Sequence, residues 1–173
     1  MTTLNDAVMV SGAVGGIVYG YFAGPRVYSF KDLSGAFTHP LLLLPLTFTS
    51  YSGIGLKKIT VMMKTERTKH IVGADGVVIP IYVPGNDGSI VITCQQNSAA
   101  HKTLLNWYKM VKTAIDGGDV SNFATGTMTV RTMSTGIGHI IDGISIPKLG
   151  EKVYAIQGGD VEWPLPAANI RNI

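Results

Sequence analysis

A histidine between two acidic residues is the arrangement in this sequence closest to a catalytic site. His70 lies four residues after Glu66 and five before Asp75, and a histidine flanked by carboxylates can act in general acid–base catalysis. On an extended strand, however, Glu66 and His70 would lie on one face about 13 Å apart, because each residue advances the chain by about 3.3 Å. That separation is too long for a hydrogen bond. The pattern therefore favours a polar loop or a solvated strand end over an active site.

The rest of the sequence also lacks catalytic or metal-binding patterns. The other histidines, His39, His101 and His139, are scattered without metal-ligand spacing. No GxSxG, HExxH, CxxC or Walker motif is present. We therefore expect no catalytic residue, no cofactor, no metal and no enzymatic activity.

The single cysteine, Cys94, limits the redox chemistry. A lone cysteine cannot form an internal disulfide and fits a reducing compartment. Neither a histidine nor a second cysteine lies near it in sequence, so a small buried hydrophobic residue is a better interpretation than a reactive thiol.

Composition limits the class of protein. The 173 residues fit one domain, and 14% of them are charged, against about 25% in an average soluble protein. Mean hydropathy is positive. So few charges indicate a chain that hides part of its surface against copies of itself or another large partner. The net charge of +3, without a dense Lys/Arg run, gives little indication of nucleic-acid binding.

The stretch from Thr65 to Ile115 is the most regular part of the sequence, and it contains Glu66, His70, Asp75 and Cys94. It predicts a β-hairpin with arms Val77–Val83 and Ser89–Gln96, joined by a turn at Gly85–Gly88. Pro80 within the first arm indicates an edge strand or a bulge. An edge strand this apolar needs a cover, which a partner chain would supply. The predicted contacts between subunits on this arm are Val78, Ile79, Ile81 and Tyr82.

One long helix is predicted from about residue 98 to residue 115. Asn97 or Ser98 can cap its start, and Gly117-Gly118 ends it. Apolar residues recur at helical spacing, which is typical of a packing face against a sheet and not of a cofactor site. This predicted helix face consists of Leu104, Trp107, Tyr108, Val111 and Ile115.

The remaining regular segments are predicted strands separated mostly by glycine-bearing turns. About eight short strands and one helix predict a mainly β (α+β) fold, an antiparallel β-sandwich or barrel with one flanking α-helix. Beyond the hairpin, the predicted strands are Val27–Leu33, Ile59–Met63, Thr127–Met133, His139–Ile146, Lys152–Ile156 and Val161–Leu165.

The first residues raise the question of a membrane. Ala7–Gly24 contains eighteen residues without a charge, whereas a transmembrane helix needs about 20 apolar residues and a signal peptide needs a basic start. Five glycines make this segment a poor helix and a good extended arm. We predict an N-terminal glycine-rich arm or edge segment over residues 1–26, a β-barrel domain over 27–173, and no membrane partner.

Four consecutive leucines, Leu41, Leu42, Leu43 and Leu44, lie between Pro40 and Pro45. The prolines prevent a long helix, because each lacks an amide donor and restricts the residue before it. Two interpretations remain open: a loop folded over the core, or an arm that docks on a neighbouring subunit. On the second interpretation these leucines are further contacts between subunits.

Several short motifs, in their order and spacing, resemble the tail tube proteins of contractile-tailed bacteriophages (myovirus-type major tail tube subunits). The similarity runs from about Tyr28 to the C-terminus. The motifs are Tyr28-Ser29-Phe30-Lys31-Asp32-Leu33-Ser34-Gly35, Thr65-Glu66-Arg67-Thr68-Lys69-His70, Ala74-Asp75-Gly76, Gly88-Ser89-Ile90, Gln95-Gln96-Asn97-Ser98, His101, Gly118-Asp119 and Gln157-Gly158.

The resemblance implies a structural virion protein. Its sheets would join edge to edge between subunits into hexameric rings, and the rings would stack into the tail's inner tube, a conduit for genome ejection. The implied partners are further copies of the chain, the tail sheath protein outside, and the tape measure protein and then double-stranded DNA in the lumen, bound without sequence specificity. Baseplate and tail terminator proteins would bind at the ends. The implied location is the virion tail, assembled in the host bacterial cytoplasm.

Two other classes of protein remain as alternatives. A tube subunit of a related contractile injection particle, pyocin-like or from a secretion system, would share the architecture without carrying DNA. A secreted or surface β-sandwich binding module is the second alternative. The lack of a recognisable signal peptide and of paired cysteines counts against this module.

Overall fold

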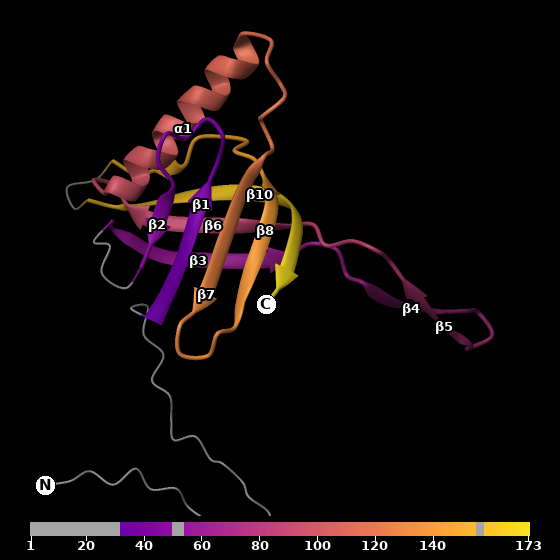
Figure 1. Cartoon of the computed structure of the whole chain (residues 1–173). Helices are drawn as coiled ribbons and strands as arrows, with labels where there is room; N and C mark the ends of the chain where they lie inside the picture. The colour runs from indigo at the N-terminus through magenta and orange to yellow at the C-terminus, as the bar shows by residue number, and fades with distance from the viewer. Residues whose placement is uncertain (1–31, 50–53, 155–157) are drawn as a thin grey trace, which may run out of the picture.

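The computed structural model describes residues 32–49, 54–154 and 158–173. The predicted N-terminal arm and most of the predicted strand Val27–Leu33 lie outside these residues, as does the end of the predicted strand Lys152–Ile156. The elements in chain order are β1 (Leu33–Thr38), β2 (Leu46–Phe48), β3 (Leu56–Met63), β4 (Thr68–Val72), β5 (Val78–Tyr82), β6 (Gly88–Gln95), α1 (Ala99–Asp116), β7 (Gly126–Thr132), β8 (Gly138–Ile144), β9 (Glu151–Lys152) and β10 (Asp160–Asn172) (Figure 1).

Eight strands form one curled antiparallel sheet in the order β2-β1-β7-β8-β10-β6-β3, with β9 added beside β10. The long strand β10 holds the sheet together, because its first part pairs with β6 and its last part with β8. Pro164 and Pro166 lie where β6 is the only described strand paired with β10. A proline donates no backbone hydrogen bond and is tolerated where one side of a strand is unpaired. The predicted strand Val161–Leu165 lies in the first part of the longer strand β10.

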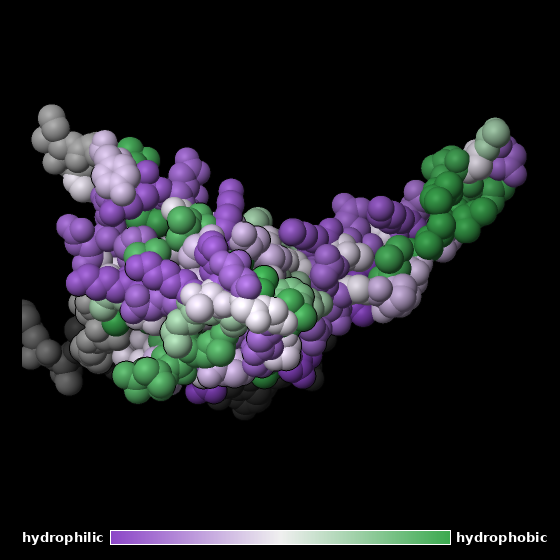
Figure 2. Space-filling model, turned by 90° about the horizontal axis from the view of Figure 1, so that it is seen from above, coloured by the Kyte–Doolittle hydropathy of each residue, from purple (hydrophilic) through white to green (hydrophobic). Residues whose placement is uncertain are grey.

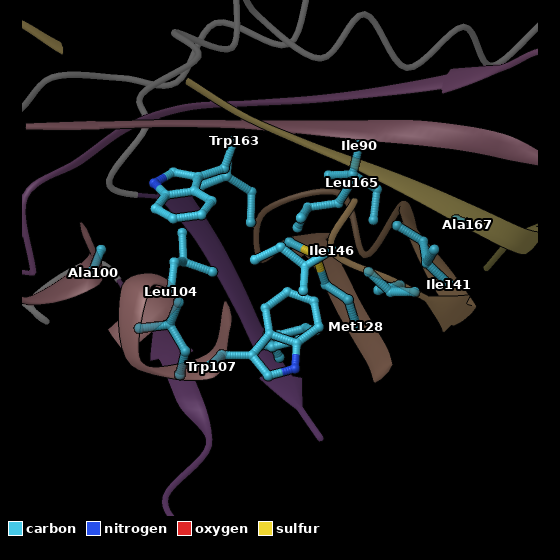
Figure 3. Packing of buried hydrophobic residues seen from close by; sticks show 14 of the residues in the cluster. Ile90, Ala100, Leu104, Trp107, Met128, Ile141, Ile146, Trp163, Leu165 and Ala167 are labelled. Carbon is cyan, nitrogen blue, oxygen red and sulfur yellow. The ribbon is translucent and has the colours of Figure 1, made fainter. Parts of the chain in front are cut away.

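Helix α1 packs on this sheet and closes the core (Figure 1). Ser98 is its N-cap, and the Ser98 hydroxyl oxygen accepts a hydrogen bond from the His101 backbone N–H at 3.1 Å, which satisfies one of the free amides of the first turn. Figure 3 shows Leu104 and Trp107 of the helix beside Trp163 and Met128 of the sheet. We call the eight-stranded sheet and α1 together the body.

The packing face of the helix is shorter than the predicted one. Leu104, Trp107 and Val111 are buried, and Tyr108 packs against the core while partly exposed. Ile115 is 42% exposed, which corrects its assignment to this face. It lies in the last turn of α1, and the described core beneath the helix ends at Val111.

The predicted hairpin between Val77–Val83 and Ser89–Gln96 is wrong. β5 pairs with β4 and not with β6, and these two strands form a separate sheet that projects from the body (Figure 1). β6 has no free side, because β3 and β10 both pair with it. Gly88 is the first residue of β6 and not part of a turn. A side chain at this position would collide with the Met62 carbonyl.

The fold class is nevertheless the predicted one, mainly antiparallel β with a single flanking helix in the described residues. No helix within residues 32–49, 54–154 and 158–173 has the length and apolar character needed to cross a membrane.

Candidate functional site: exposed surfaces for assembly

The structure does not assemble the acid–base constellation considered from the sequence. His70 is exposed in the middle of β4, and Glu66 precedes this strand. Asp75 lies in the turn at the tip of the hairpin, where its carboxylate accepts a hydrogen bond from the Val77 N–H at 3.1 Å. Within the described ranges, no three metal-ligating side chains gather in one place. These residues form a strand and its turn.

Two other histidines have structural roles in the core. His39 accepts the Leu41 N–H on Nδ1 at 3.1 Å and donates from Nε2 to the Asn122 carbonyl at 2.8 Å. His101 accepts the Trp163 indole N–H on Nδ1 at 3.2 Å. Burial lowers the pKa of both imidazoles. Both rings are therefore neutral anchors of the packing.

Cys94 is fully buried in β6 and free. Its thiol points to the Val161 carbonyl at 3.8 Å, and burial is the main cause that raises the pKa of the thiol. A protonated and enclosed thiol is a poor nucleophile, in agreement with the interpretation of Cys94 as a small core residue.

The most conspicuous surface is the projecting pair β4–β5, which we call the hairpin (Thr68–Tyr82). Every residue in both strands is exposed. Figure 2 shows hydrophobic side chains gathered on its outer half, away from the body. The predicted contacts Val78, Ile79, Ile81 and Tyr82 all lie on β5 of this hairpin. An exposed apolar patch of this kind marks an interaction surface.

The strand register sorts the hairpin into two faces, because directly paired residues share a face and neighbours alternate. Ile71 pairs with Ile79, and Lys69 pairs with Ile81, on one side. We call Ile71, Ile79 and Ile81 the isoleucine face. The opposite side carries the pairs Thr68–Tyr82, His70–Pro80 and Val72–Val78.

Polar contacts fasten the base of the hairpin. The Lys64 N–H donates to the Asp87 carbonyl at 3.0 Å, and the Thr65 hydroxyl donates to the Asp87 carboxylate. Arg67 donates to the Tyr82 hydroxyl at 2.6 Å and lies over its ring. The base is therefore polar and held in place, while the outer half presents apolar side chains.

The leucine run, which we call the leucine loop (Leu41–Leu44), divides into two halves. Leu41 and Leu42 pack against the core, whereas Leu43 and Leu44 are 93% and 76% exposed. The burial of Leu41 and Leu42 matches a loop folded over the core. The exposure of Leu43 and Leu44 matches an arm that docks on a neighbouring subunit.

Beside this loop is a shallow groove with a volume of about 370 Å³. Its walls come from the leucine loop, the start of β2 and one side of α1, including Leu43, Leu44, Thr103, Asn106 and Met110. None of the described residues that line it is charged. The volume lies near the lower end of small-molecule sites, so the groove suits a few apolar side chains.

The free side of β3 is a surface that was not predicted from the sequence. This eight-residue strand is the last in the described sheet, and β6 is its only neighbour there. A long strand at the end of a sheet presents unpaired backbone groups that another chain can pair with. The edge strand predicted from the sequence was the arm Val77–Val83, which forms β5 of the hairpin and not an edge of the large sheet. The signal available in the sequence was the pair Lys57-Lys58, since lysine is common on edge strands.

Comparisons with known proteins agree on one architecture. A family model described as Bacteriophage PhiTE tail tube protein matches residues 26–173. Among curated proteins, no sequence matches the chain.

Solved structures show the same fold at low sequence identity. One similar chain comes from the cryo-EM structure of the anti-feeding prophage (AFP) baseplate, with a TM-score of 0.55 and 10% identity over 88% of this chain and 97% of that one. Another comes from the PVC sheath/tube terminator of an extracellular contractile injection system in the extended state, with a TM-score of 0.53 and 8% identity over 87% and 99%.

The family match covers most of the sequence, from the residues just before β1 to the C-terminus. The fold, with its curled antiparallel sheet and flanking helix, is shared with chains of contractile injection particles. The chain belongs to the Bacteriophage PhiTE tail tube protein family.

Proposed function

We propose that copies of this chain form hexameric rings, which stack into the inner tube of a phage contractile tail and make the conduit for genome ejection. The observation that carries this proposal is the hairpin, a folded part of the chain whose apolar side chains are exposed throughout. An isolated two-stranded hairpin is marginally stable in water. A second protein surface would bury its isoleucine, valine and tyrosine side chains and stabilise it.

The free edge of β3 supports the ring. Pairing of β3 with a neighbouring subunit would satisfy its backbone groups and extend the sheet across the interface. Such a contact joins two different surfaces, and contacts of this kind generate closed rings or open filaments. Rings with continuous sheets have no exposed edge, which removes the risk of uncontrolled aggregation.

The proposed partners follow from the tube. The sheath protein would contact the outside, and the tape measure protein and then double-stranded DNA would occupy the lumen. Baseplate and terminator proteins would bind at the ends. Chains of similar fold come from a baseplate and a sheath/tube terminator, which supports this set. The mild net charge of +3 suits a lumen through which DNA slides, since each exposed lysine or arginine would hold a phosphate.

A tube subunit of a pyocin-like or secretion-system particle is the second candidate, since the similar chains include one from a cryo-EM structure of an extracellular contractile injection system. This particle would use the same exposed surfaces and carry no DNA. Genes for a capsid and a terminase beside the gene for this chain would favour the phage tail.

Negative-stain electron microscopy of the purified protein tests the proposal. We expect rings or tubes of uniform diameter at high protein concentration, because assembly buries the hairpin and the edge of β3. Size-exclusion chromatography coupled to light scattering gives the number of subunits in the smallest closed species, expected to be a hexamer. A protein that stays monomeric at high concentration would contradict the proposal.

A matched pair of variants connects assembly to the surface. Leu43→Asp should fold normally and form fewer tubes, because this side chain is 93% exposed. Lys109→Asp, on α1 and outside the groove lining, is the control for an added acidic residue. Leu42 is less suitable for this test, since it packs against the core.

A further inference from the structure

We propose that the hairpin of one copy inserts its isoleucine face into the groove between the leucine loop and α1 of the next copy. This inference rests on the proposed function and deepens it, because it names the surface that receives the hairpin. The contact joins two different surfaces and is repeated identically from copy to copy.

The hairpin has the properties of an inserting element. Ile71, Ile79 and Ile81 lie together on one face, where Lys69 is paired with Ile81 at the end nearer the base, and Ile79 is 55% exposed. Neither β4 nor β5 packs substantially on any other described element. Fastening at the base by Lys64, Thr65 and Asp87 holds the isoleucine face in position before it meets a partner. Pre-ordering of this kind reduces the entropy lost on binding.

The groove has matching properties. Leu43, Leu44 and Met110 give it an apolar wall, and Thr103 and Asn106 supply neutral polar side chains on α1. The strands β4 and β5 contain only Lys69 and His70 as basic residues and no acidic residue. Without paired opposite charges, the contact would depend on apolar burial, and salt would not weaken it.

The two surfaces lie on opposite sides of the molecule. In Figure 1 the hairpin extends away from the body on one side, while α1 and the connection between β1 and β2 lie on the other. A hairpin in this position cannot fill the groove of its own chain. Head-to-tail contact between copies fills both surfaces and leaves a free hairpin and a free groove at the two ends, which is the geometry of a growing stack.

Disulfide trapping between copies tests this inference. The native Cys94 is fully buried, so newly introduced cysteines are the reactive ones. Ile79→Cys and Leu43→Cys proteins are prepared separately, mixed, assembled and oxidised, and the products are resolved on a non-reducing gel. The control replaces Ile79→Cys with Val78→Cys, whose side chain lies on the opposite face of the hairpin.

We expect a covalent dimer in the Ile79→Cys and Leu43→Cys mixture, several times more abundant than in the Val78→Cys mixture and absent from wild type. Tubes without this dimer would overturn the docking inference and leave the proposed function intact. A dimer of Ile79→Cys with itself, at equal yield with or without the partner, would show that hairpins meet each other and would also overturn it. A wild-type protein that makes neither rings nor tubes would remove the proposed function and the docking inference together.

Discussion

The body and the hairpin are built from the same kinds of residue with opposite results. Ile92 in β6 is fully buried, whereas Ile79 in β5 is 55% exposed. Strand β6 is covered by paired strands on both sides and by the core below it. Among the described elements, β5 has one paired neighbour, β4, and nothing else packs substantially on it. Apolar β-branched residues therefore stabilise a strand only as far as neighbouring elements take them out of water.

This difference separates folding from assembly. The body contains the buried aromatic and aliphatic cluster that forms the core of the subunit. The hairpin adds little to the stability of the monomer, because its side chains are still in contact with water. We expect the side chains of the hairpin to stabilise the assembly once a second copy covers them.

The largest expected effect comes from the body. Trp163→Ala removes a fully buried ring and the hydrogen bond from its indole N–H to His101, and should lower the free energy of unfolding by about 3–5 kcal/mol. Ile79→Ala is the matched change in the hairpin, where we expect a loss within about 0.5 kcal/mol. Urea unfolding followed by far-ultraviolet circular dichroism, at concentrations below assembly, measures both. Similar losses of unfolding free energy in the two variants would contradict the distinction between the body and the hairpin.

Acid should weaken the body. Burial lowers the pKa of His39 and His101 below the ordinary value, and nearby Lys152 adds to the effect on His101. The unfolded chain therefore binds more protons than the folded one as the pH falls below about 6.5. Stability is full above this pH and is lost progressively as the folded imidazoles are forced to protonate.

The urea midpoint measured as a function of pH checks this expectation. The protein has two tryptophans, and each ring contacts one of these histidines, so tryptophan fluorescence reports directly on both sites. His101→Gln keeps a hydrogen-bond acceptor but cannot titrate, so its midpoint should fall less steeply with acid. An equal slope in wild type and variant would assign the acid sensitivity to other groups.

A smaller effect than the loss of the Trp163 ring is expected at the start of α1. Ser98→Ala removes the hydroxyl that accepts the His101 N–H, and should cost about 1 kcal/mol of subunit stability. Thr113→Ala is the control, because this residue of α1 is exposed, is not the N-cap and is outside the lining of the groove. Both variants should still form tubes, since neither side chain belongs to the hairpin or to the groove. Loss of tubes in a folded Ser98→Ala protein would show that the body and the assembly surfaces are not separable.

Local patterns predicted much of the body. The helix, a cap at either Asn97 or Ser98, and the buried residues Leu104, Trp107 and Val111 follow from side chains a few positions apart, because helical hydrogen bonds are local. The structure selects Ser98 as the cap. The mainly β class follows in the same way from alternation and turns. Ile115 was misplaced because helical spacing continues past the point where the described core stops.

Pairing of strands could not be predicted in the same way. Val78–Tyr82 and Gly88–Gln95 are separated by a short turn-like link, and short separations usually indicate a hairpin. Strand β10, more than sixty residues later in the chain, pairs with one side of β6, and β3 pairs with the other. Competition for the same backbone groups between distant strands is not visible in any short stretch of sequence.

The sequence by itself determined that this chain is mainly β with one capped helix, that its low charge leaves apolar surface to cover, and that its acidic residues and histidines make no catalytic pattern. These properties depend on residue type and short-range spacing. The tertiary structure decided that β5 leaves the body with β4, that β3 becomes the open edge, and that half of the leucine loop faces outward. Those outcomes depend on which distant backbone groups are already paired, and only the folded chain specifies that.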